Sequence, residues 1–449
     1  MFDVEEEGLL PHSNNSNHSS LVGRHARGNY EPVLKAVAKI SHAFIQLFTP
    51  SFCHRSPGYH NQVQQPRRAT SYLDGLRGYA AVASFVFYGY DIHDHNLWFH
   101  QLPIVRLFYT GTWPISVFFP LKESRKRAEV GVGDPSRSVA SSLIRRPVRL
   151  YGLPIISSFV TMLVIYLGAF EDTIAINETH PARLPSFASQ LSDWAHETWR
   201  MLNIFWWGDL HNRYDVHLWT ISTEFPYVVI QPRIRKLLLS GLILYVYALD
   251  RWDVGLFFAG VLIADTSFSV AEYPVSSQSK DYYKSSAYTA ALALLFGLSL
   301  WLLSAPDFCV QTTPGFQSLS RLIPSSDPAP FRFIPNLGGI LLVAILTGTG
   351  SSNSLVSVFL DSAVPQYLGR ISYSLYIVHG PLMHTLGYWL FSISWSFIGA
   401  HNTRNYVTGF SIAYVLFVSI TIWTADLVCR TIDEPCVRLA KAIQQRISL

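Results

Sequence analysis

Apolar residues gather in runs along most of the chain, and polar or charged stretches separate the runs. A helix needs roughly 20 apolar residues to cross a bilayer, or fewer where other helices surround it. The pattern therefore predicts an all-α, polytopic integral membrane protein with about ten transmembrane helices. The predicted segments centre on 76–92, 103–119, 148–170, 216–231, 237–250, 254–265, 285–303, 334–349, 371–397 and 406–428.

The second of these segments is too short for a straight crossing. Between Pro103 and Phe119 it contains Arg106 and Pro114, and Phe119 is followed directly by Pro120. The uninterrupted apolar part does not cover about 30 Å of hydrocarbon. We expect either a helix that is broken and buried among its neighbours, or a chain from which residues are missing at this point.

Charges in the loops orient the segments. Eight cations lie within 122–149, before the third segment, and the positive-inside rule places them in the cytoplasm. The loop 171–215 is acidic and carries a glycosylation sequon at Asn177, which fits a lumenal or external face. An even number of crossings puts both termini in the cytosol. The expected location is the endomembrane system or the plasma membrane.

Composition supports this class. Hydrophobic residues make up 49% of the chain and charged residues 14%, whereas soluble domains carry roughly 25% charged residues. Residues 1–69 are polar and predict a disordered cytosolic tail, with an interfacial helix over 36–52 as the alternative, and 70–445 form the transmembrane domain. The net charge of +4 is small and no nucleic-acid motif is present, so no nucleic-acid partner is expected. The four cysteines lack metal-site spacing, so no metal is expected.

Four polar blocks interrupt the apolar helices, at 74–77, 145–149, 217–224 and 369–381. Ionisable groups inside membrane segments are costly, so they are functional candidates. In the first block Asp74 and Arg77 stand at the mouth of a helix. Position 88 lies about 16 Å deeper in the membrane than Arg77, on nearly the same face of the helix. This geometry suits a long substrate whose charged end is held at the rim while its reactive end reaches the middle of the membrane.

The blocks resemble signatures of the acyltransferase 3 family, in particular its fungal members. The resemblance covers roughly residues 70–445 and rests on four ordered stretches: DGLRG at 74–78, HLW at 217–219 with Glu224, LGRISYSLY at 368–376 with HGP at 379–381, and DEP at 433–435. It implies a membrane enzyme that moves an acyl group, often acetyl, from coenzyme A to a hydroxyl of a carbohydrate, lipid or secondary metabolite. The partners would be acyl-coenzyme A as co-substrate, the hydroxyl acceptor and membrane lipid, with no permanently bound cofactor.

The resemblance also implies roles for single residues. Arg77, Tyr88 and Glu224 take the catalytic positions, and Asp74, His217 and His379 are expected to bind substrate. A third group is predicted to hold coenzyme A phosphates, with anchoring on anionic lipid headgroups as an equal alternative: Arg145, Arg146 and Arg149.

The chain departs from the family in two places. The family has its catalytic base, a histidine, eleven residues after the arginine, and this chain has Tyr88 there. Tyrosine, with a pKa near 10, is a poor base at neutral pH, although it can donate a hydrogen bond to an oxyanion. The family also continues after Phe119 with a Ser-Gly-Tyr or Ser-Gly-Phe stretch, which is missing here. The gap falls where the second segment is short.

Two other functional classes remain open. One is a non-catalytic relative that binds the acyl donor or a partner, since the expected base is lost. The other is a transporter, which the broken helices and intramembrane charges allow, although the halves show no inverted repeat. Structural roles also remain open for single residues: an Asp74–Arg77 pair that locks the start of a helix, a bond from Glu224 to a neighbouring helix, and a hydrogen-bonded His379 at a helix break.

Overall fold

The computed structural model is all-α, as predicted, and its described residues contain helices and one isolated bridge between Asn212 and Asp215. The described residues are 46, 48–53, 71–83, 102–107, 111–130, 135–170, 181–203, 212–224, 235–249, 251–272, 286–307, 309–324, 330–349 and 355–447. The chain divides into two units, Met1–His60 and Asn61–Leu449. The predicted tail at 1–69 lies almost wholly outside the described residues, which include there the short 3₁₀ helix η1 (Ser51–Cys53).

All elements discussed below belong to the second unit. Each of the ten predicted segments coincides, wholly or in part, with one or more of its helices. Their bounds are α3 (Ser71–Ala83), α4 (Pro103–Arg106), α5 (Thr112–Val130), α6 (Pro135–Leu167), α7 (Phe187–Leu202), η4 (Val216–Leu218), α8 (Trp219–Glu224), α9 (Arg235–Ala248), α10 (Trp252–Glu272), α12 (Ser286–Leu303), α13 (Gln317–Ser320), α14 (Pro330–Thr349), α15 (Leu355–Leu360), α16 (Ala363–Leu382), η5 (Met383–Gly387), α17 (Tyr388–Ile398), α18 (Thr403–Val428), η6 (Cys429–Asp433) and α19 (Glu434–Ile447).

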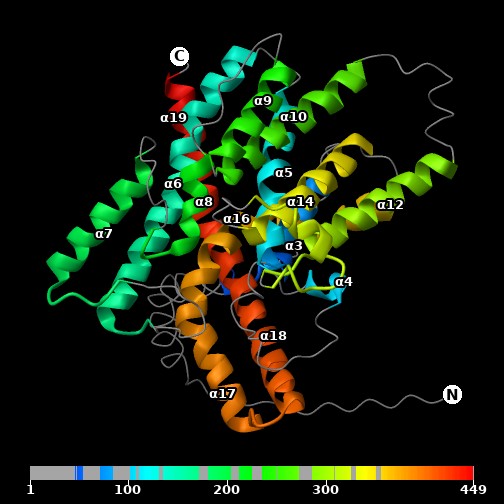
Figure 1. Cartoon of the computed structure of the whole chain (residues 1–449). Helices are drawn as coiled ribbons and strands as arrows, with labels where there is room; N and C mark the ends of the chain where they lie inside the picture. Colours follow the sequence, from blue (N-terminus) through cyan, green and yellow to red (C-terminus); the bar gives the residue numbers. More distant parts are fainter. Residues whose placement is uncertain are drawn as a thin grey trace, which may run out of the picture. The chain divides into compact units, whose positions relative to one another are not determined.

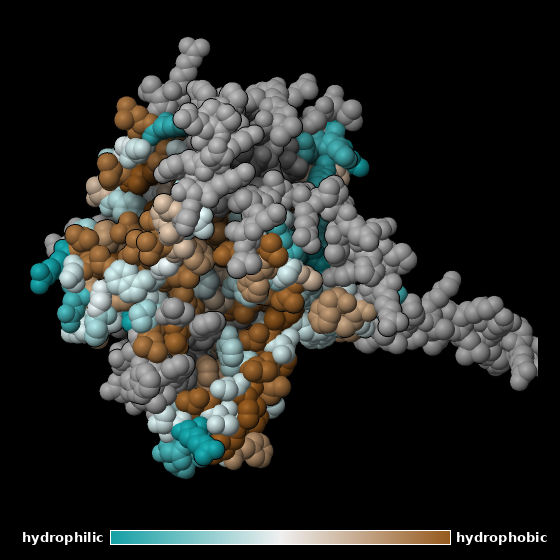
Figure 2. Space-filling view, turned by 90° about the vertical axis from the view of Figure 1, so that its right-hand side faces the viewer, coloured by the Kyte–Doolittle hydropathy of each residue, from teal (hydrophilic) through white to brown (hydrophobic). Residues whose placement is uncertain are grey.

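Three stretches of the described residues are long and apolar enough to cross a membrane: Leu150–Leu167, Pro330–Gly348 and Thr403–Arg446. Large apolar side chains also stand exposed on shorter helices, for example Leu244 on α9, Leu294 on α12 and Phe397 on α17. Figure 2 shows hydrophobic residues over much of the coloured surface on one face, with hydrophilic residues in smaller groups. Large exposed apolar areas of this kind mark an interaction surface.

The second predicted segment is broken, which matches the first of the two expectations for it. Its residues form the short helix α4 and then α5, which continues through Pro120. Phe119 is fully buried and its ring stacks on that of Phe257, with 4.5 Å between the centroids. A Cβ on Gly260 would lie 2.4 Å from the Pro120 carbonyl oxygen, so α10 touches α5 at the backbone. Because α3, α10 and α14 surround α5, its short apolar part is shielded by protein.

The acidic loop predicted at 171–215 contains a helix, α7, that the apolar pattern did not indicate. Ser186 caps its first turn by accepting a hydrogen bond from the Ser189 N–H. The helix is amphipathic, with buried Glu197 and Met201 on one side and exposed Trp199 on the other. It packs against α6 and α8, so the described part of this loop is joined to the helices on either side of it in the chain.

Helix α16 is central to the arrangement. It packs against α3, α6, α18 and η4 (Figure 1), and it continues into η5 and α17 without a loop. Helices α17 and α18 form an antiparallel pair (Figure 1). Since α16 contacts the elements that carry the first and third polar blocks, its own residues link those blocks.

Candidate functional site

The first polar block folds as the start of α3, and its two charges pair as predicted. Arg77 Nη2 lies 3.3 Å from Asp74 Oδ1, one helical turn away. The guanidinium also donates to α16, from Nε to Ser372 Oγ at 2.8 Å and from Nη2 to the Gly369 carbonyl at 2.6 Å. Arg77 therefore joins two helices whose residues are almost 300 positions apart in the chain.

The glycines beside this pair allow the two helices to cross at close range. A Cβ on Gly78 would lie 2.5 Å from the Gly369 nitrogen, and a Cβ on Gly369 would overlap the Asp74 carbonyl. No side chain fits between α3 and α16 at this crossing. The glycines of the first block thus allow the two helices to pack closely, and the Asp74–Arg77 pair lies where these helices meet.

A second charged cluster lies beside the crossing and was not anticipated from the sequence. Asp426 of α18 is fully buried, 3.4 Å from Arg370 Nη2 and 3.1 Å from Arg430 Nη2. A buried carboxylate is stable only with such partners. The signal that could have found it is an aspartate within the otherwise apolar run of α18.

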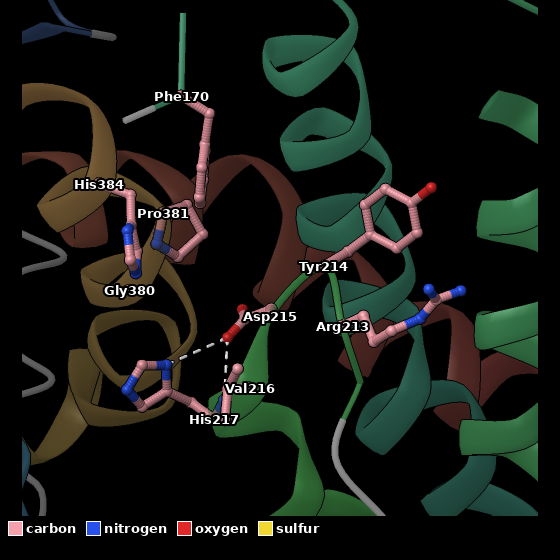
Figure 3. A pocket seen from close by; sticks show the side chains of 9 residues that line it. All are labelled: Phe170, Arg213, Tyr214, Asp215, Val216, His217, Gly380, Pro381 and His384. Carbon is pink, nitrogen blue, oxygen red and sulfur yellow. Dashed lines mark hydrogen bonds and ion pairs between the residues drawn. The ribbon is translucent and has the colours of Figure 1, made fainter. Parts of the chain in front are cut away.

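The third polar block contains a carboxylate–imidazole pair. Asp215 caps the 3₁₀ helix η4, accepting at Oδ1 from the His217 backbone N–H at 3.2 Å. The same oxygen lies 3.2 Å from Nδ1 of the His217 ring (Figure 3). His217 therefore stands in a 3₁₀ turn ahead of α8, and not on the α-helix that ends at Glu224. The capping aspartate ends the loop in a tight turn before the α-helix begins.

His379 of α16 faces this pair. Its ring centroid lies 4.4 Å from that of His217, and its Nδ1–H donates to the Tyr376 carbonyl at 2.5 Å. The Tyr376 hydroxyl donates to the His217 carbonyl at 2.9 Å and accepts from Thr220 Oγ1 at 3.1 Å. A helix break at Gly380–Pro381 was one expectation, and it is wrong, because α16 continues to Leu382 and passes into the wide turn η5.

A pocket opens beside the pair (Figure 3), lined by Phe170, Arg213, Tyr214, Asp215, Val216, His217, Gly380, Pro381 and His384. The rings of Phe170 and His384 stack, with centroids 4.7 Å apart and planes 14° apart. His217 and Asp215 form its polar wall, whereas His379 is not among the lining residues. The pocket therefore offers an aromatic surface next to a carboxylate-bound imidazole.

Helix α7 holds the loop that presents Asp215. Arg213 pairs with Asp193 at 2.8 Å and with Glu197 at 3.2 Å. The Tyr214 hydroxyl donates to Asp193 Oδ2 at 2.8 Å and accepts from Gln190 Nε2 at 2.9 Å. Burial, together with the hydrogen bond to Asp193, raises the pKa of Tyr214 above its usual value of 10.0, so the hydroxyl stays protonated. The two residues before Asp215, which also line the pocket, are thus held in place by α7.

The structure sorts the candidate residues into two groups joined by α16. Asp74 and Arg77 meet at Gly369 and Ser372, and His217 meets His379, which is two helical turns beyond Ser372, about 10 Å. The backbone of α6 carries three arginines whose side chains lie outside the described residues: Arg145, Arg146 and Arg149. The same holds for the side chain of Glu224 at the end of α8. Tyr88 lies outside the described residues altogether.

Asp215 and Tyr376 are site residues that the sequence alone did not single out. The signal for Asp215 is an aspartate two residues before a histidine, a spacing typical of a side chain that caps a turn. Tyr376 lies inside a recognised block, but its contact with His217 joins positions far apart in the chain. A single sequence carries no signal for that contact.

Comparison with known proteins relates the chain to fungal acyltransferases. It is 29% identical to the O-acetyltransferase PaAT-1 of Phomopsis amygdali, over 89% of this chain and 88% of that protein. It is 24% identical to acyltransferase R4 of a Phoma species and 22% identical to acyltransferase clz18 of Cochliobolus lunatus, in both cases over 87% of this chain and 99% of the relative. No family model and no solved structure matches. The prediction of an enzyme of the acyltransferase class is confirmed by these relatives.

Proposed function

We propose that this protein is a membrane-embedded O-acyltransferase of the acyltransferase 3 type, which moves an acyl group, with acetyl as the leading candidate, from coenzyme A to a hydroxyl of a carbohydrate, lipid or secondary metabolite. The observation that carries the proposal is the placement of two polar groups along α16, in a chain related to fungal acyltransferases over most of its length. One group is cationic and the other contains a carboxylate-bound imidazole. Thioester transfer needs both kinds of group, one for the anionic donor and one for the proton.

The proposal includes the location of the protein in a membrane. We assign about ten crossings and cytosolic termini, on the strength of the apolar runs and the positive-inside pattern. Three long apolar stretches and the exposed leucines of α9 and α12 support this setting. Exposed apolar side chains are unfavourable in water, but their contact with lipid tails carries no such free-energy cost.

In this scheme the donor approaches from the cytosolic end. Arg77 lies there with Arg370 and Arg430, and α6 brings its three arginines, Arg145, Arg146 and Arg149, to the predicted cytosolic side. From Gly369 to His379 the helix rises about 15 Å. A donor whose phosphates bind near the cations would extend its acyl end along this distance towards the imidazoles.

The acceptor binds at the other group. Its hydroxyl loses a proton as it attacks the thioester carbonyl, and a hydrogen-bond donor stabilises the oxyanion that forms. The proposal keeps His217, His379 and Glu224 on the acceptor side. It gives Tyr88 the role of a donor to the oxyanion, which suits a hydroxyl that is protonated at neutral pH.

The test is transfer of label from radiolabelled acetyl-coenzyme A by full-length protein in yeast microsomes. The acceptor panel contains octyl glucoside, farnesol and ergosterol, together with a total extract of fungal metabolites. Wild-type protein is expected to acetylate at least one acceptor, and Arg77→Gln to lose transfer. The matched control is Arg404→Gln, which neutralises an exposed arginine on α18 and is expected to keep the wild-type rate.

Two results would overturn the enzymatic proposal. Wild-type protein that binds acetyl-coenzyme A but labels nothing in the panel or the extract would be a non-catalytic relative. Flux of a labelled solute through reconstituted vesicles, without donor and without transfer, would make the protein a transporter. Equal transfer by wild type and Arg77→Gln would leave acyl transfer standing and remove Arg77 from the donor site.

A further inference from the structure

The contact of His217 with Asp215 fixes the tautomer of the His217 ring. Nδ1 lies 3.2 Å from Asp215 Oδ1, and a carboxylate oxygen accepts, so Nδ1 carries the proton. Nε2 therefore holds the lone pair of the neutral ring. The side chain of Asp215 is 1% exposed and that of His217 12% exposed. A buried carboxylate behind a partly open imidazole is the arrangement that lets an imidazole accept a proton, because the carboxylate stabilises the positive charge that results.

The second oxygen of Asp215 strengthens this interpretation. Oδ2 is buried and has no hydrogen-bond partner among the described residues. Leaving a buried carboxylate oxygen without a partner costs free energy, because its hydration is lost and nothing replaces it. Such a cost is typical of a site whose partner arrives with the substrate or during the reaction.

The other histidines are less suited to the same task. His379 donates its Nδ1–H to a backbone carbonyl, which is a weaker support for a charged ring than a carboxylate, and it does not line the pocket. His384 lines the pocket, with its ring stacked on Phe170. A positive charge on His217 also disfavours a second charge on His379 at 4.4 Å.

We infer that His217 is the general base of the acyl transfer, positioned by Asp215, and that the acceptor hydroxyl binds in the pocket beside it. This inference rests on the proposed function and replaces the family's base, whose position is occupied by Tyr88. The pocket has room for a hydroxyl group beside the imidazole, against the rings of Phe170 and Pro381.

The reaction balances with the groups named. The acceptor O–H proton passes to His217 Nε2 while the acceptor oxygen forms a bond to the thioester carbonyl carbon. The carbon–sulfur bond then breaks, and the leaving thiolate takes the proton from the imidazolium and departs as coenzyme A thiol. The products are the O-acyl ester and coenzyme A, and the enzyme returns to its initial protonation state.

The experiment measures kcat/KM against pH for acetyl-coenzyme A, with the best acceptor of the panel as probe. His217→Gln is expected to lower kcat by about 10²–10⁴-fold. Asp215→Asn keeps the shape of the side chain, and is expected to lower kcat less and to move the acidic limb of the profile to lower pH. Tyr88→Phe is expected to leave the midpoint of that limb where it is in the wild type.

Groups around His217 that titrate or carry charge are Asp215 beside it, Tyr376 and His379 on α16, His384 on η5, and Arg213 at the pocket rim. Of these, Asp215 alone has a side-chain oxygen recorded within hydrogen-bond distance of the His217 ring in the described part of the chain. Asp215→Asn thus separates a catalytic imidazole from a structural one. Loss of a merely structural bond lowers the melting temperature without moving the pH profile.

The matched control is His401→Gln, which replaces an exposed histidine between α17 and α18 and is expected to match the wild type in rate and profile. Each variant is checked for acetyl-coenzyme A binding and for its thermal midpoint in detergent. An active wild type with His217→Gln at the same rate and profile overturns the base assignment and leaves acyl transfer intact. A folded wild type that transfers no acyl group overturns the proposed function itself.

Discussion

Gly380 is placed where a side chain would collide with the candidate base. A Cβ at this position would lie 2.7 Å from His217 Nδ1 and 3.0 Å from its Cε1. The ring of His217 therefore occupies the space next to the backbone of α16, and both residues line the pocket. The glycine of the His-Gly-Pro stretch is explained by the residue opposite it, in a different polar block.

We expect Gly380→Ala to push the His217 ring out of place and to lower kcat by roughly 10²-fold, as displacements of about 1 Å do in active sites. The control is Gly297→Ala on α12, where a Cβ meets nothing within 4 Å. That variant should keep full activity and gain up to about 1 kcal/mol of stability. Acetyl transfer and thermal unfolding of both variants check the prediction. A fully active Gly380→Ala protein would contradict it.

Asp307 gives a residue-scale prediction on stability. Burial raises the pKa of Asp307 from 3.8 to about 6, and the hydrogen bond from Thr112 at 2.8 Å and the charge of Arg332 offset part of that shift. The folded state thus binds this proton more tightly than the unfolded state. Between pH 3.8 and about 6 the contribution of this group to stability falls as pH rises.

Asp307→Asn removes the titration and can still accept from Thr112. We expect it to raise the free energy of unfolding at pH 7 relative to wild type, by no more than about 3 kcal/mol. The difference should shrink as pH is lowered towards 4. Thermal midpoints of both proteins in detergent across this range measure it. A difference that does not change with pH would show that the carboxyl of Asp307 is not the cause.

At the scale of elements, α7 acts as a clamp on the loop before η4. Its residues Gln190, Asp193 and Glu197 hold Arg213 and Tyr214, and the next residue is Asp215. Arg213 and Tyr214 also line the pocket, so the clamp holds part of the pocket wall as well as the loop. A change in α7 therefore reaches the chemistry through the position of the carboxylate.

Tyr214→Phe removes two side-chain hydrogen bonds of this clamp and is expected to destabilise the loop by about 1–2 kcal/mol. We predict faster amide exchange at 212–217 and a lower kcat, with the KM for acetyl-coenzyme A unchanged. Tyr245→Phe on α9 is the matched control, since that tyrosine is 60% exposed. If both variants exchange at the wild-type rate at 212–217, α7 does not hold the loop.

The apolar runs predicted most helices because burial and membrane insertion both select long apolar stretches. They did not indicate α7, because its buried side includes the polar residues Gln190 and Glu197, which bond Tyr214 and Arg213 outside the helix. The bond between Asp74 and Arg77 was predictable because it joins neighbours one turn apart. The contact between His217 and His379 was not, because it depends on how η4 packs against α16.

At the scale of the whole molecule, the orientation of the chain rests on its loop charges. The sequon at Asn177, which lies outside the described residues, should be glycosylated if the loop before α7 is lumenal. We expect an endoglycosidase-sensitive shift in gel mobility for the wild type that Asn177→Gln abolishes. An unmodified wild type whose Asn177 loop is cut by protease added to the cytosolic side would reverse the assigned topology.

The continuous α16 has a consequence for the evolution of the chain. Arg77 donates to this helix at Gly369 and Ser372, and His217 contacts it at Tyr376 and His379. Inserting one residue between these points would rotate one set of contacts by about 100° relative to the other and separate them by a further 1.5 Å. Substitutions can accumulate at its half-buried positions, but length changes cannot. Among functional descendants of this protein, changes in loop length should therefore appear earlier and more often than the gain or loss of a residue between 369 and 379.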